Sequence, residues 1–366
     1  MPFGQRSAAV EFGDVAWPAS APCKPRFMII GSPKCGTTSL FDYVASHPDV
    51  QRPALKEVCY FSTFKRWLQR YRKTPASDWA LYVASFGGRL PAGRGNGRGR
   101  GRRQLGLGRA LQQQHSSRVA SLAAAGLKCE AAGRQSFEAC PFYLGEVGAA
   151  AAIRRVFPQM RAIAILRNPR ARTISAFNDY VRMGRIRGHN ASTAGMDAIV
   201  GEKIALLRSG RRTMESYDMR ILTSGVYVYG LRAWGVQWPS AQLLVLRSED
   251  LFADTPATMA RVQSFLGLAR PFEPGPLLRA SNRNTDASRS APSNALERRL
   301  DDFFSPYNEE LYAWLRARGM DAHFPRWDAG GGTPTRSRGR RRRRLRDETW
   351  STEWRHSTNA SRVGYQ

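Results

Sequence analysis

Short apolar runs alternate along the chain with stretches in which apolar residues have helical spacing. The first run, residues 27–30, ends at Gly31, and Leu40, Phe41 and Val44 then share one side of a predicted helix. This part of the chain is therefore predicted to form a strand, a glycine turn and a helix.

In two further units a predicted strand is again followed by a helix, and a helix also precedes each strand. The predicted elements are a helix at residues 150–157, a strand at 162–166, a helix at 169–180, a helix at 227–234, a strand at 242–246 and a helix at 255–266. An amphipathic helix at 296–315 is expected to break at Pro306. Apolar strands that alternate with helices indicate one α/β domain, with a central parallel sheet flanked by helices on both faces.

Composition sets the predicted domain boundaries. Residues 1–25 are predicted to be a disordered leader, 26–327 the folded domain with a flexible Arg/Gly-rich insert at 87–110, and 328–366 a disordered basic tail. The hydrophobic fraction of 42% in 366 residues is enough for a sizeable core, which excludes wholesale disorder.

The formal net charge of +28 has two explanations. A basic field concentrates anions, so the excess of arginine suits a site for a nucleotide with several phosphates and a polyanionic acceptor. For the insert and the tail, a genome that favours arginine codons is an equal alternative. These two segments also leave open a protein whose main function is to bind polyanions or nucleic acid.

Cysteine spacing argues against metal chemistry. The five cysteines form no C-x-x-C pair and have no histidine at ligand spacing, so neither a zinc site nor a redox dithiol is predicted. Cys129 and Cys140 are candidates for a disulfide in an oxidising compartment. There is no apolar run of 18 residues and no signal peptide, which leaves a soluble protein or one whose N-terminal anchor precedes this sequence.

The turn after the first strand is a predicted phosphate loop. Backbone N–H groups and the N-terminus of the following helix attract an anion. Its order is G-x-x-K-x-G-T-T-x-L, in which Lys34 precedes Gly36, whereas a Walker loop has lysine after the second glycine. A G-x-G-x-x-G dinucleotide fingerprint is absent as well. A nucleotide-dependent kinase or ATPase remains an alternative, supported only by the glycine turn.

A second phosphate motif follows the strand at 162–166. Its sequence is L-R-N-P-x-x-R-x-x-S-x-F, in which the Arg167 guanidinium can fork onto a phosphate that Ser175 also reaches. Arg172 either joins them or braces the loop. The two motifs resemble the 5′-phosphosulfate loop and the 3′-phosphate element of sulfotransferases that use 3′-phosphoadenosine-5′-phosphosulfate (PAPS). The resemblance covers residues 27–327 without the insert and implies a P-loop-like fold.

A third block indicates the acceptor. Residues 56–61, K-E-x-x-Y-F, resemble the block of heparan-sulfate and chondroitin-type carbohydrate sulfotransferases in which the glutamate is the base. The resemblance makes Glu57 the base and Lys34 the cation at the leaving phosphate. A surface carboxylate that only pairs with Lys56 is the alternative for Glu57. Residues 138–143 resemble the segment that lines the acceptor cleft, but Ala139 replaces a lysine of the heparan-sulfate 3-O type, which favours the GalNAc-4-sulfate 6-O type.

The resemblance implies a complete set of site residues. Those expected to bind PAPS are Lys34, Cys35, Gly36, Thr37, Thr38, Ser39, Arg167, Ser175 and Arg283, and those expected at the acceptor are Lys56, Glu57, Glu138, Cys140 and Tyr143. Arg283 is the weakest, because it stands in for an S-K-G-R loop that this sequence lacks. The expected reaction sulfates a glycan hydroxyl, releases adenosine 3′,5′-bisphosphate and needs no metal. The family implies the Golgi lumen, with the cytoplasm as the alternative.

Overall fold

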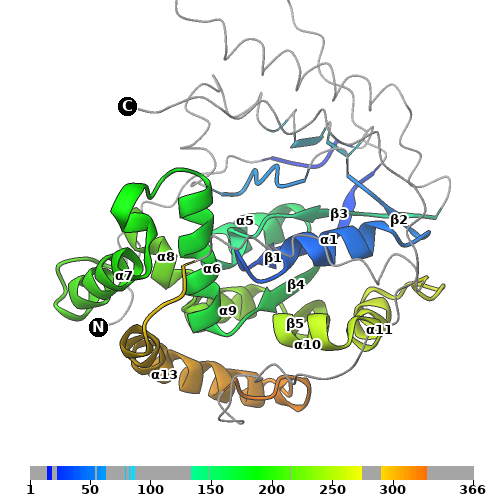
Figure 1. Cartoon of the computed structure of the whole chain (residues 1–366). Coiled ribbons are helices and arrows are strands. Elements are labelled where there is room, and N and C mark those ends of the chain that lie inside the picture. The colour runs from blue at the N-terminus through cyan, green and yellow to red at the C-terminus, as the bar shows by residue number, and fades with distance from the viewer. Residues whose placement is uncertain are drawn as a thin grey trace, which may run out of the picture. The chain divides into compact units, whose positions relative to one another are not determined.

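A five-stranded parallel sheet forms the centre of the protein (Figure 1). The computed structural model describes residues 15–18, 23–53, 56–62, 79, 82–83, 85–86, 133–146, 148–214, 216–273 and 290–327. Across the sheet the strands are β2 (Val50–Gln51), β3 (Gln135–Ala139), β1 (Pro25–Gly31), β4 (Arg161–Leu166) and β5 (Leu243–Arg247). This order confirms the predicted α/β fold with a parallel sheet.

Helices connect the strands and cover the sheet. They are α1 (Thr37–Ala45), α5 (Ala149–Val156), α6 (Pro169–Arg182), α7 (Thr193–Arg208), α8 (Arg220–Thr223), α9 (Tyr227–Gln237), α10 (Ser248–Ala253), α11 (Thr255–Leu266) and α13 (Asn294–Ala317). Right-handed crossovers place α1 on one face and α5 and α9, which contact each other, on the opposite face.

The chain reverses its direction of travel across the sheet at β1 and β4. The connection after β1 leads toward β3, and the connection after β4 leads the other way, toward β5. The two strands are adjacent, and beyond β1 the Ser32 N–H still donates to the Ile165 carbonyl of β4, at 2.8 Å. Ligands of open parallel sheets bind in the crevice at such a switch point. The loops after β1 and β4 carry the two predicted phosphate motifs.

Local signals explain the helix ends that the sequence predicts. α6 begins where the Asn168 side chain accepts the Ala171 N–H at 3.1 Å, with Pro169 in the first turn. α11 ends at Gly267, whose φ of 65° closes the helix in the left-handed region. β3 was not predicted as a strand, because its sequence QSFEA is short and partly polar.

The predicted break at Pro306 is wrong, because α13 continues through this residue. A proline inside a helix costs about 3 kcal/mol. Beyond it, Leu311, Tyr312 and Leu315 are buried, and each such side chain contributes about 1.5–3 kcal/mol. The helix contacts α9, α6 and α7, so the apolar surface that these contacts bury outweighs the lost hydrogen bond.

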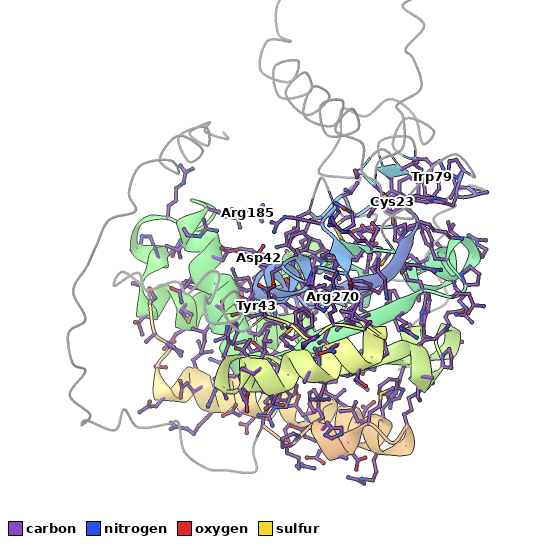
Figure 2. All side chains as sticks on the ribbon, turned by 90° about the vertical axis from the view of Figure 1, so that its right-hand side faces the viewer. Cys23, Asp42, Tyr43, Trp79, Arg185 and Arg270 are labelled. Carbon is purple, nitrogen blue, oxygen red and sulfur yellow. A yellow bond between two sulfur atoms is a disulfide. The ribbon has the colours of Figure 1, made fainter. Side chains whose placement is uncertain are left out.

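Part of the predicted leader packs against the domain. The Trp17 ring lies 6.2 Å from the Trp79 ring and 5.9 Å from the Phe86 ring, and Cys23 is disulfide-bonded (Cys23 and Trp79, Figure 2). The insert at 87–110 and the tail at 328–366 lie outside the described residues, so the predicted boundaries stay predictions. None of the helices in the described ranges is both long enough and apolar enough to cross a bilayer.

Candidate active site

The phosphate loop joins β1 to α1. Lys34 and Gly36 both have left-handed backbone, with φ of 69° and 88°. A side chain at Gly36 would also approach the Phe252 ring to 3.2 Å, so the turn requires glycine there. No side chain caps α1 and its first turn carries no acidic residue. The first N–H groups of a helix have no carbonyl one turn earlier to bond with, which makes the start of α1 suited to an anion.

The Arg172 side chain holds this loop through a hydrogen bond to its backbone. Its side chain is buried, donates from Nε to the Pro33 carbonyl at 3.1 Å, and donates from Nη1 to the Ile221 carbonyl at 2.8 Å. Of the two roles that the sequence left open for Arg172, the structure shows the structural one.

Arg167 and Ser175 come from the second motif. Arg167 directly follows β4, is partly exposed, and lies 3.4 Å through Nη1 from the Lys34 carbonyl. Ser175 lies on α6 seven residues after the cap Asn168, which is close to two helical turns, so the two share one side of the helix. The tertiary structure thus brings the second motif against the phosphate loop. Arg283 falls outside the described residues.

Cys35 turns inward from the phosphate loop. It is fully buried, its Sγ lies 3.5 Å from the Tyr227 hydroxyl, and its N–H donates to the Ser32 carbonyl at 3.2 Å. The Tyr227 hydroxyl in turn donates to the Arg167 carbonyl at 2.8 Å. Burial raises the pKa of the Cys35 thiol. Cys35 therefore supports the two motifs from inside the protein.

The Cys35 thiol is expected to resist alkylation. A raised pKa leaves less thiolate at a given pH, and burial blocks the reagent. At pH 8, iodoacetamide should leave Cys35 unmodified in the folded protein and modify it completely in 6 M guanidinium chloride, as measured by peptide mass spectrometry. Equal labelling in both conditions would contradict the buried placement.

Lys34 is held by a carboxylate on α6. Its Nζ lies 3.2 Å from Asp179 Oδ1, and Arg182 contacts the same oxygen at 2.6 Å. The Lys34 side chain keeps 33% of its surface exposed, whereas Asp179 keeps 12%. A cation is therefore held at the edge of the phosphate loop and remains accessible from solvent. Asp179 was not among the predicted residues, because only the packing of α6 brings it to Lys34.

Lys56 links Glu57 to the phosphate loop. Its Nζ donates to Thr38 Oγ1 on α1 at 2.6 Å and lies 3.3 Å from Glu57 Oε1. Both side chains are partly exposed. Glu57 thus has the ion pair that the plain surface interpretation expects, and the lysine of that pair also contacts α1.

Glu57 and Cys59 have unusual backbone conformations. Their φ angles are 61° and 53°, and Lys34 is the other non-glycine with a positive φ among the described residues. A residue with a Cβ in this region costs roughly 1–2 kcal/mol. Such residues cluster at functional sites, where the surrounding structure imposes them.

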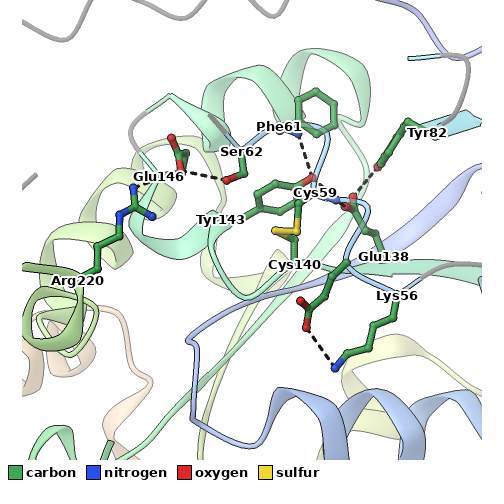
Figure 3. The surroundings of a disulfide bond; sticks show 11 residues. Lys56, Cys59, Phe61, Ser62, Tyr82, Glu138, Cys140, Tyr143, Glu146 and Arg220 are labelled. Atoms are coloured by element: carbon green, nitrogen blue, oxygen red, sulfur yellow. Dashed lines mark hydrogen bonds and ion pairs between the residues drawn. A yellow bond between two sulfur atoms is a disulfide. The ribbon is translucent and has the colours of Figure 1, made fainter. Parts of the chain in front are cut away.

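Several buried residues of β3 and the turn after it lie beside residues 56–62 (Figure 3). Cys140 forms a disulfide with Cys59, so the predicted candidate pair Cys129–Cys140 is wrong. The two cysteines are far apart in sequence and meet because residues 56–62 lie against the end of β3. Glu138 and Tyr143, also predicted for the acceptor side, are both buried. The Tyr143 hydroxyl donates a hydrogen bond to Glu138 Oε1 at 2.8 Å.

An open parallel α/β domain with a glycine turn at the switch point of its sheet belongs to a class of folds whose ligands bind beside that turn. Within this class the chain belongs to the Sulfotransferase family, whose family model matches residues 25–274, more than half of the chain. The predicted family resemblance is confirmed.

Two human relatives share part of this sequence. Carbohydrate sulfotransferase 15 of Homo sapiens is 24% identical over 330 residues, which cover 80% of this chain and 55% of that protein. Heparan sulfate glucosamine 3-O-sulfotransferase 6 of Homo sapiens is 22% identical over 316 residues, which cover 80% of this chain and 73% of the relative. The chain thus spans little more than half the length of carbohydrate sulfotransferase 15.

A solved structure supports the fold. The sulfotransferase from Alicyclobacillus acidocaldarius superimposes with a TM-score of 0.51 at 21% identity, over 80% of this chain and 96% of that one. This similarity confirms the predicted architecture of a central parallel sheet with flanking helices.

Proposed function

We propose that this protein transfers a sulfuryl group from PAPS to a hydroxyl group of a glycan. The observation that carries this proposal is the lysine bridge between Glu57 and Thr38, because it joins a partly exposed carboxylate to the phosphate loop. In-line transfer needs a base on the acceptor side and a cation on the leaving phosphate, and the reaction then depends mainly on positioning and charge neutralisation.

Each group has one role in the proposed reaction. Glu57 accepts the proton of the acceptor hydroxyl as its oxygen forms a bond to sulfur. The bond from sulfur to the 5′-phosphate oxygen breaks, and Lys34 neutralises the charge that collects on that oxygen. Adenosine 3′,5′-bisphosphate leaves, held until then by Arg167 and Ser175 at its 3′-phosphate. The negatively charged phosphosulfate of bound PAPS would compete with Asp179 for the Lys34 ammonium group.

The glycan acceptor is supported by the K-E-x-x-Y-F block and by the relatives. The two human relatives described above are both named as sulfotransferases of carbohydrates. Ala139, in place of the lysine of the heparan-sulfate 3-O type, favours a chondroitin-like acceptor that carries GalNAc 4-sulfate. Cys23 and the Cys59–Cys140 pair are disulfide-bonded, which suits an oxidising compartment such as the Golgi lumen.

A transfer assay tests this proposal. The protein is incubated with ³⁵S-labelled PAPS and, in separate reactions, chondroitin 4-sulfate, unsulfated chondroitin, heparan sulfate and a small phenol. Labelled polysaccharide is expected with chondroitin 4-sulfate above all, without added divalent metal and in the presence of EDTA. Labelling of the phenol and of no polysaccharide would overturn the glycan acceptor. Labelling of heparan sulfate alone would overturn only the finer assignment.

Arg167→Ala is expected to weaken PAPS binding more than catalysis. A guanidinium that forks onto a phosphate contributes about 1.5–3 kcal/mol as a charge-assisted hydrogen bond, so the KM for PAPS should rise about 10- to 100-fold while kcat changes far less. Steady-state kinetics with varied PAPS measures the two constants. Arg232→Ala, which removes an exposed arginine that pairs with Glu310, is the matched control and should leave both constants unchanged.

A further inference from the structure

A set of buried groups anchors residues 56–62, called here the base segment because it carries Glu57. We propose that the Cys59–Cys140 disulfide and the Glu138 carboxylate position Glu57 for proton transfer, and this inference rests on the proposed role of Glu57 as the base. Glu138 lies on β3 and Cys140 directly follows it, and neither residue needs to touch the substrate (Figure 3).

The first anchor is covalent. Cys59 lies two residues after Glu57, and its disulfide partner Cys140 directly follows β3. The Cys140 N–H donates to the Ile29 carbonyl of β1 at 2.9 Å, so the cysteine is fixed to the central strand of the sheet. Since β1 also leads into the phosphate loop, the disulfide connects the base segment to the same strand that places Lys34.

The second anchor is the carboxylate of Glu138. Its Oε1 accepts the Cys59 N–H at 3.1 Å and the Tyr143 hydroxyl at 2.8 Å, while its Oε2 accepts the Tyr82 hydroxyl at 2.7 Å. Burial is the main cause that raises the pKa of both tyrosines well above its usual value, and Glu138 adds to the effect. The phenols therefore keep their protons and remain donors to Glu138.

Further contacts complete the attachment of the base segment. The Tyr143 hydroxyl accepts the Phe61 N–H at 3.1 Å, and the Ser62 hydroxyl donates to Glu146 Oε2 at 3.2 Å. Lys56 holds the other end through Thr38. Glu57 thus lies between an attachment to the donor side and an attachment to the sheet.

The backbone conformation of Glu57 and Cys59 explains why these anchors matter for the position of the carboxylate. Glu57 and Cys59 both lie in the left-handed region, which residues with a Cβ avoid unless the surroundings impose it. The anchors act on the backbone and the side chain of Cys59 itself. Without them the segment is expected to relax toward ordinary backbone angles, which would turn the Glu57 carboxylate away from its position.

Burial favours positioning over direct acceptor contact for Glu138, Cys140 and Tyr143. The exposed fractions of the three residues are 1%, 0% and 0%. The partly exposed residues on this side are Lys56 and Glu57. Three hydrogen bonds occupy most of the roughly four acceptor sites of this buried carboxylate, so the structure assigns Glu138 to the support of the segment.

The double variant C59S/C140S tests the inference. It removes the covalent anchor and keeps the size of both side chains nearly unchanged. Because small misplacements of a reacting group lower rates by up to about 100-fold, kcat is expected to fall about 10- to 100-fold, with the KM for PAPS within about twofold. Cys23→Ser breaks the other disulfide and is the matched control; it should lower thermal stability while it leaves kcat unchanged.

Combination with Glu57→Gln separates positioning from general stability. If the disulfide acts through Glu57, C59S/C140S should lower kcat strongly in the wild-type background and by less than about twofold in the Glu57→Gln background. Equal losses in both backgrounds would overturn the inference, and so would an unchanged kcat in C59S/C140S. If Glu57→Gln alone keeps full activity, the proposed base is wrong, which is a different failure.

Tyr82→Phe provides a second route should the cysteine variant fail to fold. It removes one hydrogen bond to Glu138 and keeps the ring in its aromatic contacts with Tyr60 and Phe86. A kcat about three- to tenfold lower, with the KM for PAPS unchanged, is expected, because one hydrogen bond to a charged group is lost. An unchanged kcat would contradict the role of Glu138.

Discussion

Glu57→Gln is expected to lower kcat for sulfuryl transfer by about 10²- to 10⁴-fold, with the KM for PAPS nearly unchanged. Glutamine has almost the same shape and keeps an oxygen for the contact with Lys56, but it cannot take the proton of the acceptor hydroxyl. Initial rates with labelled PAPS and the best glycan acceptor measure the effect. The loss should appear in kcat because the missing interaction exists only in the transition state.

A matched control separates the base from a general loss of a carboxylate. Glu310 on α13 is also partly exposed and paired with a basic residue, Arg232, and Glu310→Gln should keep wild-type kinetics. Full activity of Glu57→Gln would assign the base elsewhere and would leave Glu57 as the surface partner of Lys56.

Lys34→Ala is expected to lower kcat by about 10²- to 10³-fold. Negative charge collects on the leaving phosphate oxygen in the transition state, and loss of one preorganised cation or donor there has an effect of this size. The KM for PAPS should rise by less, because the α1 N-terminus and Arg167 are expected still to bind the phosphates. Steady-state rates over a range of PAPS concentrations measure both constants.

The pairing of Lys34 with Asp179 affects how this result is interpreted. Lys34→Ala also leaves Asp179 without one of its two basic partners, whereas Lys34→Arg keeps a positive charge that can reach it. Lys34→Arg should therefore retain more activity than Lys34→Ala. Lys203→Ala on α7 removes another partly buried lysine with an acidic partner and should leave both constants unchanged. Equal activity of Lys34→Ala and the wild type would exclude Lys34 from the reaction.

The sequence predicted the strand and the helix on either side of each phosphate motif, because periodicity and turn signals are local. A buried strand, a glycine turn and a helix follow one another within residues 25–45, and the order of Lys34 and Gly36 is visible without any structure. The same holds for the second motif, in which Arg167 directly follows a buried strand and Ser175 lies about two helical turns after the cap Asn168. Parallel strands then bring both motifs to one edge of the sheet.

Contacts between distant segments could not be predicted in this way. Asp179 reaches Lys34 only through the packing of α6, and Tyr82 reaches Glu138 from a different part of the chain. The pairing of five cysteines has many solutions, and spacing does not choose among them. The residues of β3 alone do not predict a strand, because they are few and partly polar. The strand is stabilised by its pairing with β1 and β2.

By itself, the sequence determined the α/β class, the family and the strands and helices that carry the two predicted phosphate motifs, since these depend on periodicity and on spacing within single units. The tertiary structure decided how the acceptor side is built. It showed that Lys56 joins Glu57 to Thr38, that Arg172 braces the phosphate loop, and that Cys59 pairs with Cys140. These contacts join segments whose meeting depends on the closure of long loops and the packing of the whole sheet, which no local pattern records.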